Sequence, residues 1–311
     1  MSPEPPAAPA TPHILRRPVT AVVFWDFDGT VYRAPAGCRR YGEEIARWLA
    51  PGQRGEYLAS LDQYLSGQGG IHAADGWEAA VELAARYLVA GDGVGSTAGD
   101  GVGSTAGEGP SDEDRPSDED RSSDVPPPAG PPAGPSALSP SRFHEEFRRA
   151  REYMESGECP LEVPRGLPEA IARMRPISRH ILLTNTPAFG VYRLLHRLGI
   201  AQCFDEVVCE AAKPTLLPAR LAAAASVYGL QMPSVLCVGD HFDNDVAPAL
   251  AARAAGAYVN AYGAGPAGAA DFEGPVLEAI LSDIERWVST AGARRSAETR
   301  APVPSGGKEQ T

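Results

Sequence analysis

The sequence predicts an α/β fold in which helices cover both faces of a parallel sheet, with a helical segment inserted after the first strand. Two observations support this prediction. Short apolar runs alternate with helical patterns from residue 160 onward, which is typical of a parallel sheet. Between the first predicted strand, at 21–25, and the next, at 178–183, the patterns are helical apart from one low-complexity stretch.

The first strand is predicted at residues 21–25, Ala-Val-Val-Phe-Trp, and runs directly into Asp26, Phe27, Asp28 and Gly29. An unbroken apolar run ended by a turn signal indicates a buried strand. The two acids that follow cannot belong to the core. Because ligands of open α/β sheets bind at the carboxyl ends of the strands, this end of the first strand is the candidate site.

The inserted segment has the pattern of amphipathic helices. Apolar residues recur at i, i+3 and i+4, as at Ile45, Trp48 and Leu49. Helices are expected at 41–50, 54–65, 76–89 and 142–154. With no strand among them, residues 35–159 are expected to form a compact helical domain.

A low-complexity stretch at 91–140 interrupts this helical domain. Gly-Asp-Gly-Val-Gly-Ser-Thr-Ala occurs at 91–98 and again at 99–106. So many glycines and acids, with almost no large apolar residue, cannot bury enough surface to offset chain entropy. We expect a disordered insertion; the alternative is a calcium-binding Gly/Asp repeat or a docking segment. Disordered tails are expected at 1–18 and 291–311.

The second half of the chain is predicted to complete the sheet. Together with residues 19–34, residues 160–290 are expected to form the catalytic core. Strands are expected at 178–183, 206–209, 234–238 and 257–259, and helices at 167–174, 189–198, 217–228, 246–255 and 276–288.

Composition excludes several classes of protein. The formal net charge of -12 argues against nucleic-acid binding, although residues 91–124 alone carry -8 of it. The five cysteines contain no C-x-x-C pair, which favours a reducing compartment and no zinc site. No stretch approaches the about 20 apolar residues of a membrane span, and the N-terminus lacks a signal-peptide core. A cytoplasmic location is expected, and the oligomeric state stays open.

Polar residues follow three of the predicted strands, and a lysine lies in a loop between them. They are Asp26 with Asp28, then Thr184 with Asn185, then Lys213, then Asp240 through Asp245. Each group alone has a structural explanation as a turn, a helix cap or a surface loop. Together, several carboxylates in one place require a cation, and oxygen ligands without His or Cys favour Mg²⁺. Lysine and threonine would supply donors to an anionic phosphoryl group.

These residues, in this order, resemble the four motifs of the haloacid dehalogenase superfamily of phosphatases. Asp26-Phe27-Asp28-Gly29-Thr30 matches the first motif, and Thr184-Asn185 the second. Lys213-Pro214 matches the third, and Gly239-Asp240 with Asp245 the fourth. The resemblance implies a Rossmann-like core with an α-helical type 1 cap at 35–159. The chain departs from the family pattern at His241, where serine is usual, and in the Tyr32-Arg33 that follows the first motif.

The resemblance also implies a role for each residue. Asp26 would attack phosphorus and Asp28 would move protons to and from the leaving group and water. Mg²⁺ would be held by Asp26, the carbonyl of Asp28 and Asp240, with Asp245 supporting the metal's waters or Lys213. Thr184, the backbone N–H of Asn185 and Lys213 would bind the phosphoryl oxygens.

The expected activity is Mg²⁺-dependent hydrolysis of a phosphate monoester of a small metabolite. Dehalogenating members lack an acid at the position of Asp28, because a halide leaves without a proton. One alternative is a sugar-phosphate mutase that uses the same residues. A second is an inactive relative that acts as a binding module, which would predict the loss of a catalytic residue.

Overall fold

The computed structural model describes residues 18–68, 71–91 and 140–299. Its sheet has six strands in the order β3-β2-β1-β4-β5-β6, and every neighbouring pair is parallel. The strands are β1 (Ala21–Trp25), β2 (Ser178–Leu183), β3 (Glu206–Val208), β4 (Val235–Gly239), β5 (Ala255–Val259) and β6 (Phe272–Gly274). The predicted α/β fold class is confirmed.

Strand β1 lies in the middle of the sheet because its five residues are apolar on both faces. Ala21, Val23 and Trp25 pack into one hydrophobic cluster, and Val22 and Phe24 pack into another on the opposite face. The chain moves outward from β1 to β2 and β3, and then returns to β4 on the other side. This reversal leaves a crevice at the carboxyl end of β1, where such sheets bind ligands.

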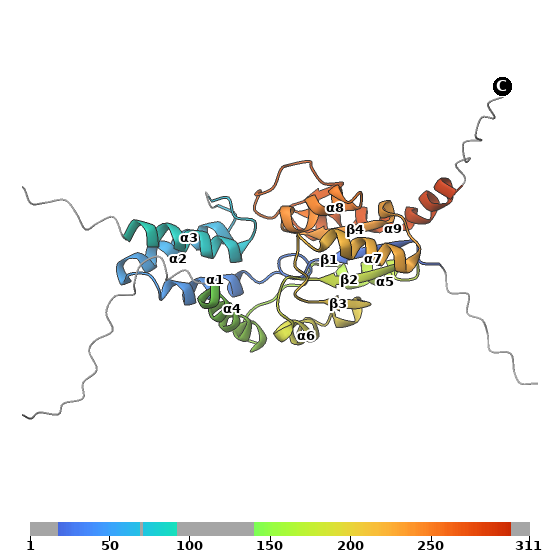
Figure 1. Ribbon diagram of the computed structural model, residues 1–311. Coiled ribbons are helices and arrows are strands. Elements are labelled where there is room, and N and C mark those ends of the chain that lie inside the picture. The colour runs from blue at the N-terminus through green and yellow to red at the C-terminus, as the bar shows by residue number, and fades with distance from the viewer. Residues whose placement is uncertain (1–17, 69–70, 92–139, 300–311) are drawn as a thin grey trace, which may run out of the picture.

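Helices cover both faces of the sheet (Figure 1). Helices α5 (Leu167–Met174), α6 (Ala188–Arg197) and α9 (Leu277–Thr299) pack on the face of Val23 and Trp25. Helices α7 (Leu217–Tyr228) and α8 (Ala247–Ala251) pack on the face of Val22 and Phe24. The alternation of strands and helices along the chain therefore places a layer of helices on each face of the sheet, as the sequence predicted.

The inserted segment folds as a separate group of four helices, which we call the cap (Figure 1). They are α1 (Pro35–Ala46), α2 (Pro51–Leu65), α3 (Gly76–Gly91) and α4 (Pro140–Glu155). Their apolar faces meet in a core of their own that includes Ile45, Tyr57, Leu61 and Ala80.

Two linkers join the cap to the sheet, and they run side by side. The N–H of Arg33 donates to the carbonyl of Glu162 at 2.8 Å, and the N–H of Glu162 donates to the carbonyl of Arg33 at 3.0 Å. The Arg33 side chain also reaches Glu278 at the start of α9. This hydrogen-bonded pair of linkers joins the cap to the core, and α4 also contacts α6, where Arg193 pairs with Glu155.

The structure differs from the predicted elements at the end of the chain. Strand β6 was not predicted, because its three residues are too few to show a strand period. The helix expected at 246–255 is a π-helical turn, Phe242–Val246, followed by the short α8. Helix α9 continues into the predicted tail, as far as Thr299, since Ala291 is buried against the core.

The other predictions of disorder fall almost entirely outside the described residues. They concern residues 1–18, residues 91–140 and the part of the predicted tail beyond Thr299. Within the described part of the chain, none of the helices is both long enough and apolar enough to cross a membrane.

A buried polar network joins the neighbouring strands β1 and β2. The indole N–H of Trp25 donates to Nδ1 of His180 at 3.0 Å, and Nε2 of His180 lies 2.8 Å from the Ser178 hydroxyl. Burial lowers the pKa of His180 to about 4. A neutral imidazole fits this place because a proton on Nδ1 would face the indole N–H.

Candidate active site

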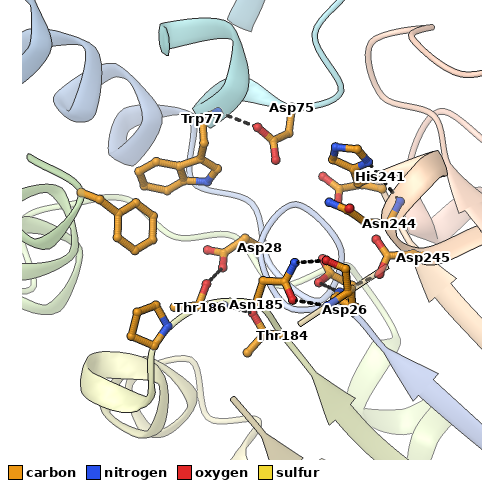
Figure 2. A pocket seen from close by; sticks show the side chains of 14 residues that line it. Asp26, Asp28, Asp75, Trp77, Thr184, Asn185, Thr186, His241, Asn244 and Asp245 are labelled. Atoms are coloured by element: carbon orange, nitrogen blue, oxygen red, sulfur yellow. Dashed lines mark hydrogen bonds and ion pairs between the residues drawn. The ribbon is translucent and has the colours of Figure 1, made fainter. Parts of the chain in front are cut away.

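The predicted site residues converge on one cavity of about 250 Å³ at the carboxyl end of the sheet (Figure 2). Asp26 and Asp28 follow β1, Thr184 and Asn185 follow β2, and Asp240 follows β4. Lys213 comes from the loop between β3 and α7, and Asp245 from the π-helical turn. The cap closes the other side with Asp75, Trp77 and Phe147. All seven residues predicted from the sequence therefore line one cavity.

Lys213 links two of the carboxylates. Its Nζ lies 2.6 Å from Oδ1 of Asp26 and 2.6 Å from Oδ1 of Asp245, and all three side chains are almost fully buried. Burial alone would lower the pKa of Lys213, but the charges of Asp245 and Asp26 outweigh it and raise the pKa. Lys213 therefore stays a cation beside the Asp26 carboxylate.

Three carboxylates form an acidic cluster. Oxygen atoms of Asp26, Asp240 and Asp245 all lie within 4.8 Å of one another. Burial raises the pKa of Asp26 to about 6, although Lys213 acts in the opposite direction. Burial, and then the charge of Asp26, raises the pKa of Asp240 well above its usual value. Buried carboxylates of this kind repel one another when they are all ionised, and a bound cation would relieve that repulsion. Because the ligands are oxygen atoms, a hard divalent cation such as Mg²⁺ fits the site.

Two glycines let these carboxylates approach the backbone. Gly29 has a φ of +82°, in the left-handed region, and a Cβ there would overlap the carboxylate of Asp240. A Cβ at Gly239 would overlap the side chain of Asp245. The hydroxyl of Thr30 lies 3.2 Å from Oδ2 of Asp26 and 3.4 Å from Oδ1 of Asp240, between the two acids.

The second motif supplies a donor to the cavity and a brace for the lysine loop. The Thr184 hydroxyl oxygen accepts from the N–H of Thr186 at 3.0 Å, so its own proton stays available to a ligand. The Asn185 side chain donates to the carbonyl of Lys213 at 3.0 Å and accepts from the N–H of Lys213 at 2.7 Å. Asn185 thus fixes the backbone from which Lys213 reaches Asp26.

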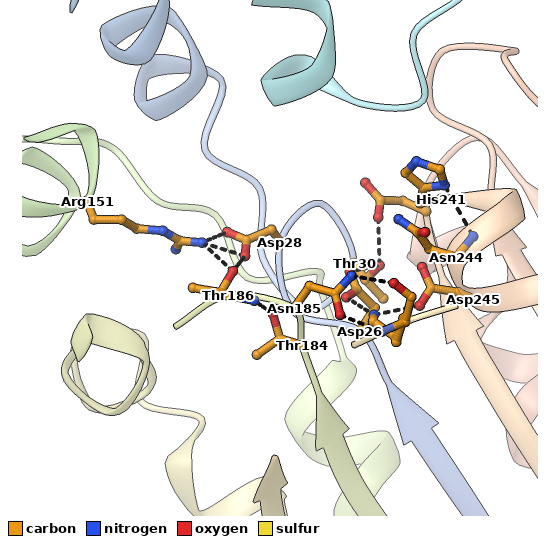
Figure 3. A network of polar contacts seen from close by, with 12 residues as sticks. Asp26, Asp28, Thr30, Arg151, Thr184, Asn185, Thr186, His241, Asn244 and Asp245 are labelled. Carbon is orange, nitrogen blue, oxygen red and sulfur yellow. Dashed lines mark hydrogen bonds and ion pairs between the residues drawn. The ribbon is translucent and has the colours of Figure 1, made fainter. Parts of the chain in front are cut away.

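The side chain of Asp28 lies in different surroundings from that of Asp26 (Figure 3). Its Oδ2 accepts from the Thr186 hydroxyl at 2.7 Å, and its Oδ1 accepts from the Tyr32 hydroxyl. Both oxygens also accept from the guanidinium of Arg151, which belongs to α4 of the cap. The two acids of the first motif therefore have separate cationic partners, Lys213 and Arg151.

Sequence reasoning missed Arg151, Thr186 and Tyr32, although a signal for Arg151 exists. Helix α4 has an apolar face that includes Phe147 and Met154, and Arg151 lies four residues after the first and three before the second. A charge in the middle of an apolar face requires a buried partner.

The cap's side of the cavity combines an acid with two aromatic rings. Oδ1 of Asp75 accepts from the N–H groups of Trp77 and Glu78, both at 2.8 Å, and so begins helix α3. Burial raises the pKa of Asp75 to about 6. The rings of Trp77 and Phe147 meet edge to face with centroids 5.0 Å apart. A ligand held here would contact both apolar and acidic side chains.

No protein-family model matches the chain, and no curated protein matches it by sequence. Similar solved structures include a haloacid dehalogenase-like family hydrolase from Xanthomonas campestris, with a TM-score of 0.47 and 16% identity over 89% of this chain and 99% of that chain.

Two other similar structures carry different activities in their names. A predicted phosphoglycolate phosphatase from Haemophilus somnus has a TM-score of 0.48 and 14% identity over 86% of this chain and 98% of that one. The L-2-haloacid dehalogenase RSc1362 has a TM-score of 0.45 and 18% identity over 88% and 99%. The seven residues whose order resembles the motifs of that superfamily lie together at one edge of the parallel sheet.

Proposed function

We propose that this protein is a Mg²⁺-dependent phosphatase that hydrolyses a small phosphate monoester through an aspartyl-phosphate on Asp26. The observation that carries the proposal is the pairing of Asp26 with Lys213 inside the acidic cluster. A second acid, Asp28, follows two residues later and has hydrogen-bond partners of its own. One acid is placed to attack and the other to move protons.

The first step transfers the phosphoryl group to the protein. A carboxylate oxygen of Asp26 forms a bond to phosphorus while the bond from phosphorus to the leaving oxygen breaks. Asp28 gives its proton to that leaving oxygen. In the second step water attacks the same phosphorus, Asp28 takes the water's proton, and the Asp26 carboxylate is released with inorganic phosphate.

The surrounding groups neutralise charge. The ammonium of Lys213, 2.6 Å from Asp26, reduces repulsion between the attacking carboxylate and the phosphoryl oxygens. The Thr184 hydroxyl and the backbone N–H of Asn185 would bind those oxygens. Mg²⁺, held by Asp26, Asp240 and the carbonyl of Asp28, with Asp245 close by, would supply further positive charge at the phosphoryl group.

Asp28 distinguishes this proposal from the other activities of similar proteins. A dehalogenase has no use for an acid here, because its halide leaves without a proton. A sugar-phosphate mutase would use the same residues and return the phosphoryl group to its substrate. A binding module without activity is disfavoured because none of the catalytic residues of the four motifs is missing.

The experiment is a panel of small phosphate monoesters assayed with Mg²⁺ and with EDTA. Wild type should release phosphate only with metal, and Asp26→Asn should be inactive. Asp243→Asn, which changes an exposed acid on the same turn as Asp245, is the matched control and should keep its activity. Turnover in EDTA, or full activity of Asp26→Asn, would contradict the mechanism. Little hydrolysis unless a bisphosphate primer is present would indicate the mutase.

A further inference from the structure

One acid, Asp75 at the start of α3, lines the cavity from the cap. Its Oδ1 caps the helix by accepting from the N–H groups of Trp77 and Glu78, both at 2.8 Å. Its Oδ2 accepts no hydrogen bond from the part of the chain that the structure describes. Figure 2 shows this carboxylate and the Trp77 ring projecting from the cap into the cavity. One oxygen of Asp75 is therefore available to a ligand.

Every other acid that lines the cavity has a cationic partner or belongs to the proposed Mg²⁺ site. The pairs are Lys213 with Asp26 and Asp245, and Arg151 with Asp28, while Asp240 belongs to the acidic cluster. Asp75 forms no ion pair with a lysine or arginine among the described residues. Within the described lining of the cavity, Lys213 is the only lysine or arginine. The imidazole of His241, which also lines the cavity, lies 4.0 Å from the carboxylate of Glu78.

Two aromatic rings line the same side of the cavity as Asp75. They belong to Trp77 and Phe147, and their centroids lie 5.0 Å apart. The guanidinium of Arg151 lies beside both rings, but its charge is paired with Asp28. Aromatic faces attract alkylammonium groups, and a carboxylate binds such a group through a charge-assisted hydrogen bond. The acid and the two rings together are suited to a small organic cation.

We infer that the substrate is the phosphate monoester of a small amino alcohol, whose ammonium group pairs with Oδ2 of Asp75 while its phosphoryl group lies at Asp26 and Lys213. The inference rests on the proposed function for the position of the phosphoryl group. Hydrolysis by water would release inorganic phosphate and the amino alcohol. A leaving group with a carboxylate would instead meet the like charge of Asp75, with no lysine or arginine of the lining left to pair with it. The competing explanation is that Asp75 only caps α3.

Three esters of similar size test the inference, because they differ mainly in the charge at the end of the leaving group. They are 2-aminoethyl phosphate, 2-hydroxyethyl phosphate and phosphoglycolate, assayed with Mg²⁺ at pH 8. Asp75 is ionised at this pH, since its pKa is about 6. Given the strength of hydrogen bonds to charged groups, kcat/KM should be about 10- to 100-fold higher for 2-aminoethyl phosphate than for 2-hydroxyethyl phosphate. Phosphoglycolate should be the poorest substrate of the three.

Asp75→Asn removes the charge but keeps a side-chain oxygen that can cap α3. It should lower kcat/KM for 2-aminoethyl phosphate about tenfold or more, and change the value for 2-hydroxyethyl phosphate less than threefold. Glu78→Gln is the matched control, because it removes a carboxylate from the same turn of α3 but outside the lining of this cavity. It should keep the preference of wild type. Should Asp75→Asn fail to fold, Asp75→Ser replaces it, since serine also caps helices.

The inference is overturned if wild type prefers 2-aminoethyl phosphate to 2-hydroxyethyl phosphate by less than fivefold, or if Asp75→Asn keeps the preference. An equal loss for all three esters in Asp75→Asn also overturns it, because that result would indicate a role in folding or metal binding.

If wild type hydrolyses none of the esters, the proposed function fails, and calorimetry with phosphonates and Mg²⁺ decides about the ammonium site. Wild type should then bind 2-aminoethylphosphonate at least fivefold more tightly than 2-hydroxyethylphosphonate, and Asp75→Asn should lose this difference. Equal Kd values in wild type, binding of neither phosphonate, or an unchanged difference in Asp75→Asn would each overturn the inference.

Discussion

The Mg²⁺ binding that we propose should depend on pH, because it would use the buried carboxylates of the acidic cluster. Burial raises the pKa of Asp26 from 3.8 to about 6. Between these two pH values the folded, metal-free protein keeps a proton on Asp26 that the unfolded chain has lost. A carboxyl group with a raised pKa contributes stability below its unfolded value, and this contribution is lost as pH rises through the folded value. Mg²⁺ should oppose this trend, because it would bind only the ionised carboxylate.

The magnitude follows from the value for Asp26 alone. At pH 5 roughly a tenth of the Asp26 carboxyl is ionised, and at pH 7 roughly nine-tenths. The apparent Kd for Mg²⁺ should therefore be about tenfold weaker at pH 5, which is about 1.4 kcal/mol. Asp240 has a raised pKa as well, so the change should be no smaller than this.

Isothermal titration calorimetry at pH 5, 6 and 7 measures the effect, and thermal melting with and without Mg²⁺ checks it independently. Asp240→Asn should abolish binding at every pH, whereas Asp243→Asn, an exposed neighbour outside the cluster, should bind as wild type does. A Kd that changes less than twofold between pH 5 and pH 7, or Asp240→Asn with wild-type affinity, would refute the reasoning.

Further predictions concern stability. Gly42→Ala should lower the free energy of unfolding by about 1–3 kcal/mol, because the added Cβ would overlap Leu61. Gly55→Ala should raise it by about 0.4–1 kcal/mol, because the added Cβ would have no atom within 4 Å and the unfolded chain would lose freedom. Urea unfolding measures both changes. His180, with its pKa lowered to about 4 from 6.5, stabilises fully above pH 6.5 and loses that contribution as pH falls towards 4. Unfolding at pH 7 and pH 5 should show this loss in wild type and less of it in His180→Phe. Replacing residues 92–139 by a short Gly/Ser linker should leave turnover and melting temperature nearly unchanged, since that composition buries little apolar surface.

The core of the fold could be predicted because its signals are local. The strand at 21–25 is apolar throughout, the strand at 178–183 ends in the apolar run Ile181–Leu183, and the cap helices repeat their apolar residues with a helical period. The start of α1 was placed too late because Pro35 and Gly37 weaken the pattern in its first turn. Strand β6 and the split before α8 depend on pairing with β5 and on the Asp245 contact with Lys213, which no local pattern contains.

The site was predictable where its residues belong to the core, at strand ends or in the loops that follow them. Thr184 and Asp240 follow apolar runs and could be identified from the sequence. The cap's contributions could not, because Asp75 reads as a helix start and Arg151 as one of several arginines on α4. What brings them to the cavity is the packing of the cap against the core.

The first motif shows why these two kinds of residue must be considered together. Asp26 and Asp28 are two positions apart, and in a continuing strand their side chains would point to the same face. Strand β1 ends at Trp25, and the turn that follows sends Asp26 to Lys213 and Asp28 to Arg151. Lys213 is recognisable because it belongs to a motif of the core. Arg151 becomes recognisable because a charge on an apolar helix face needs a buried partner of opposite charge. That partner is Asp28, the acid proposed to carry the proton.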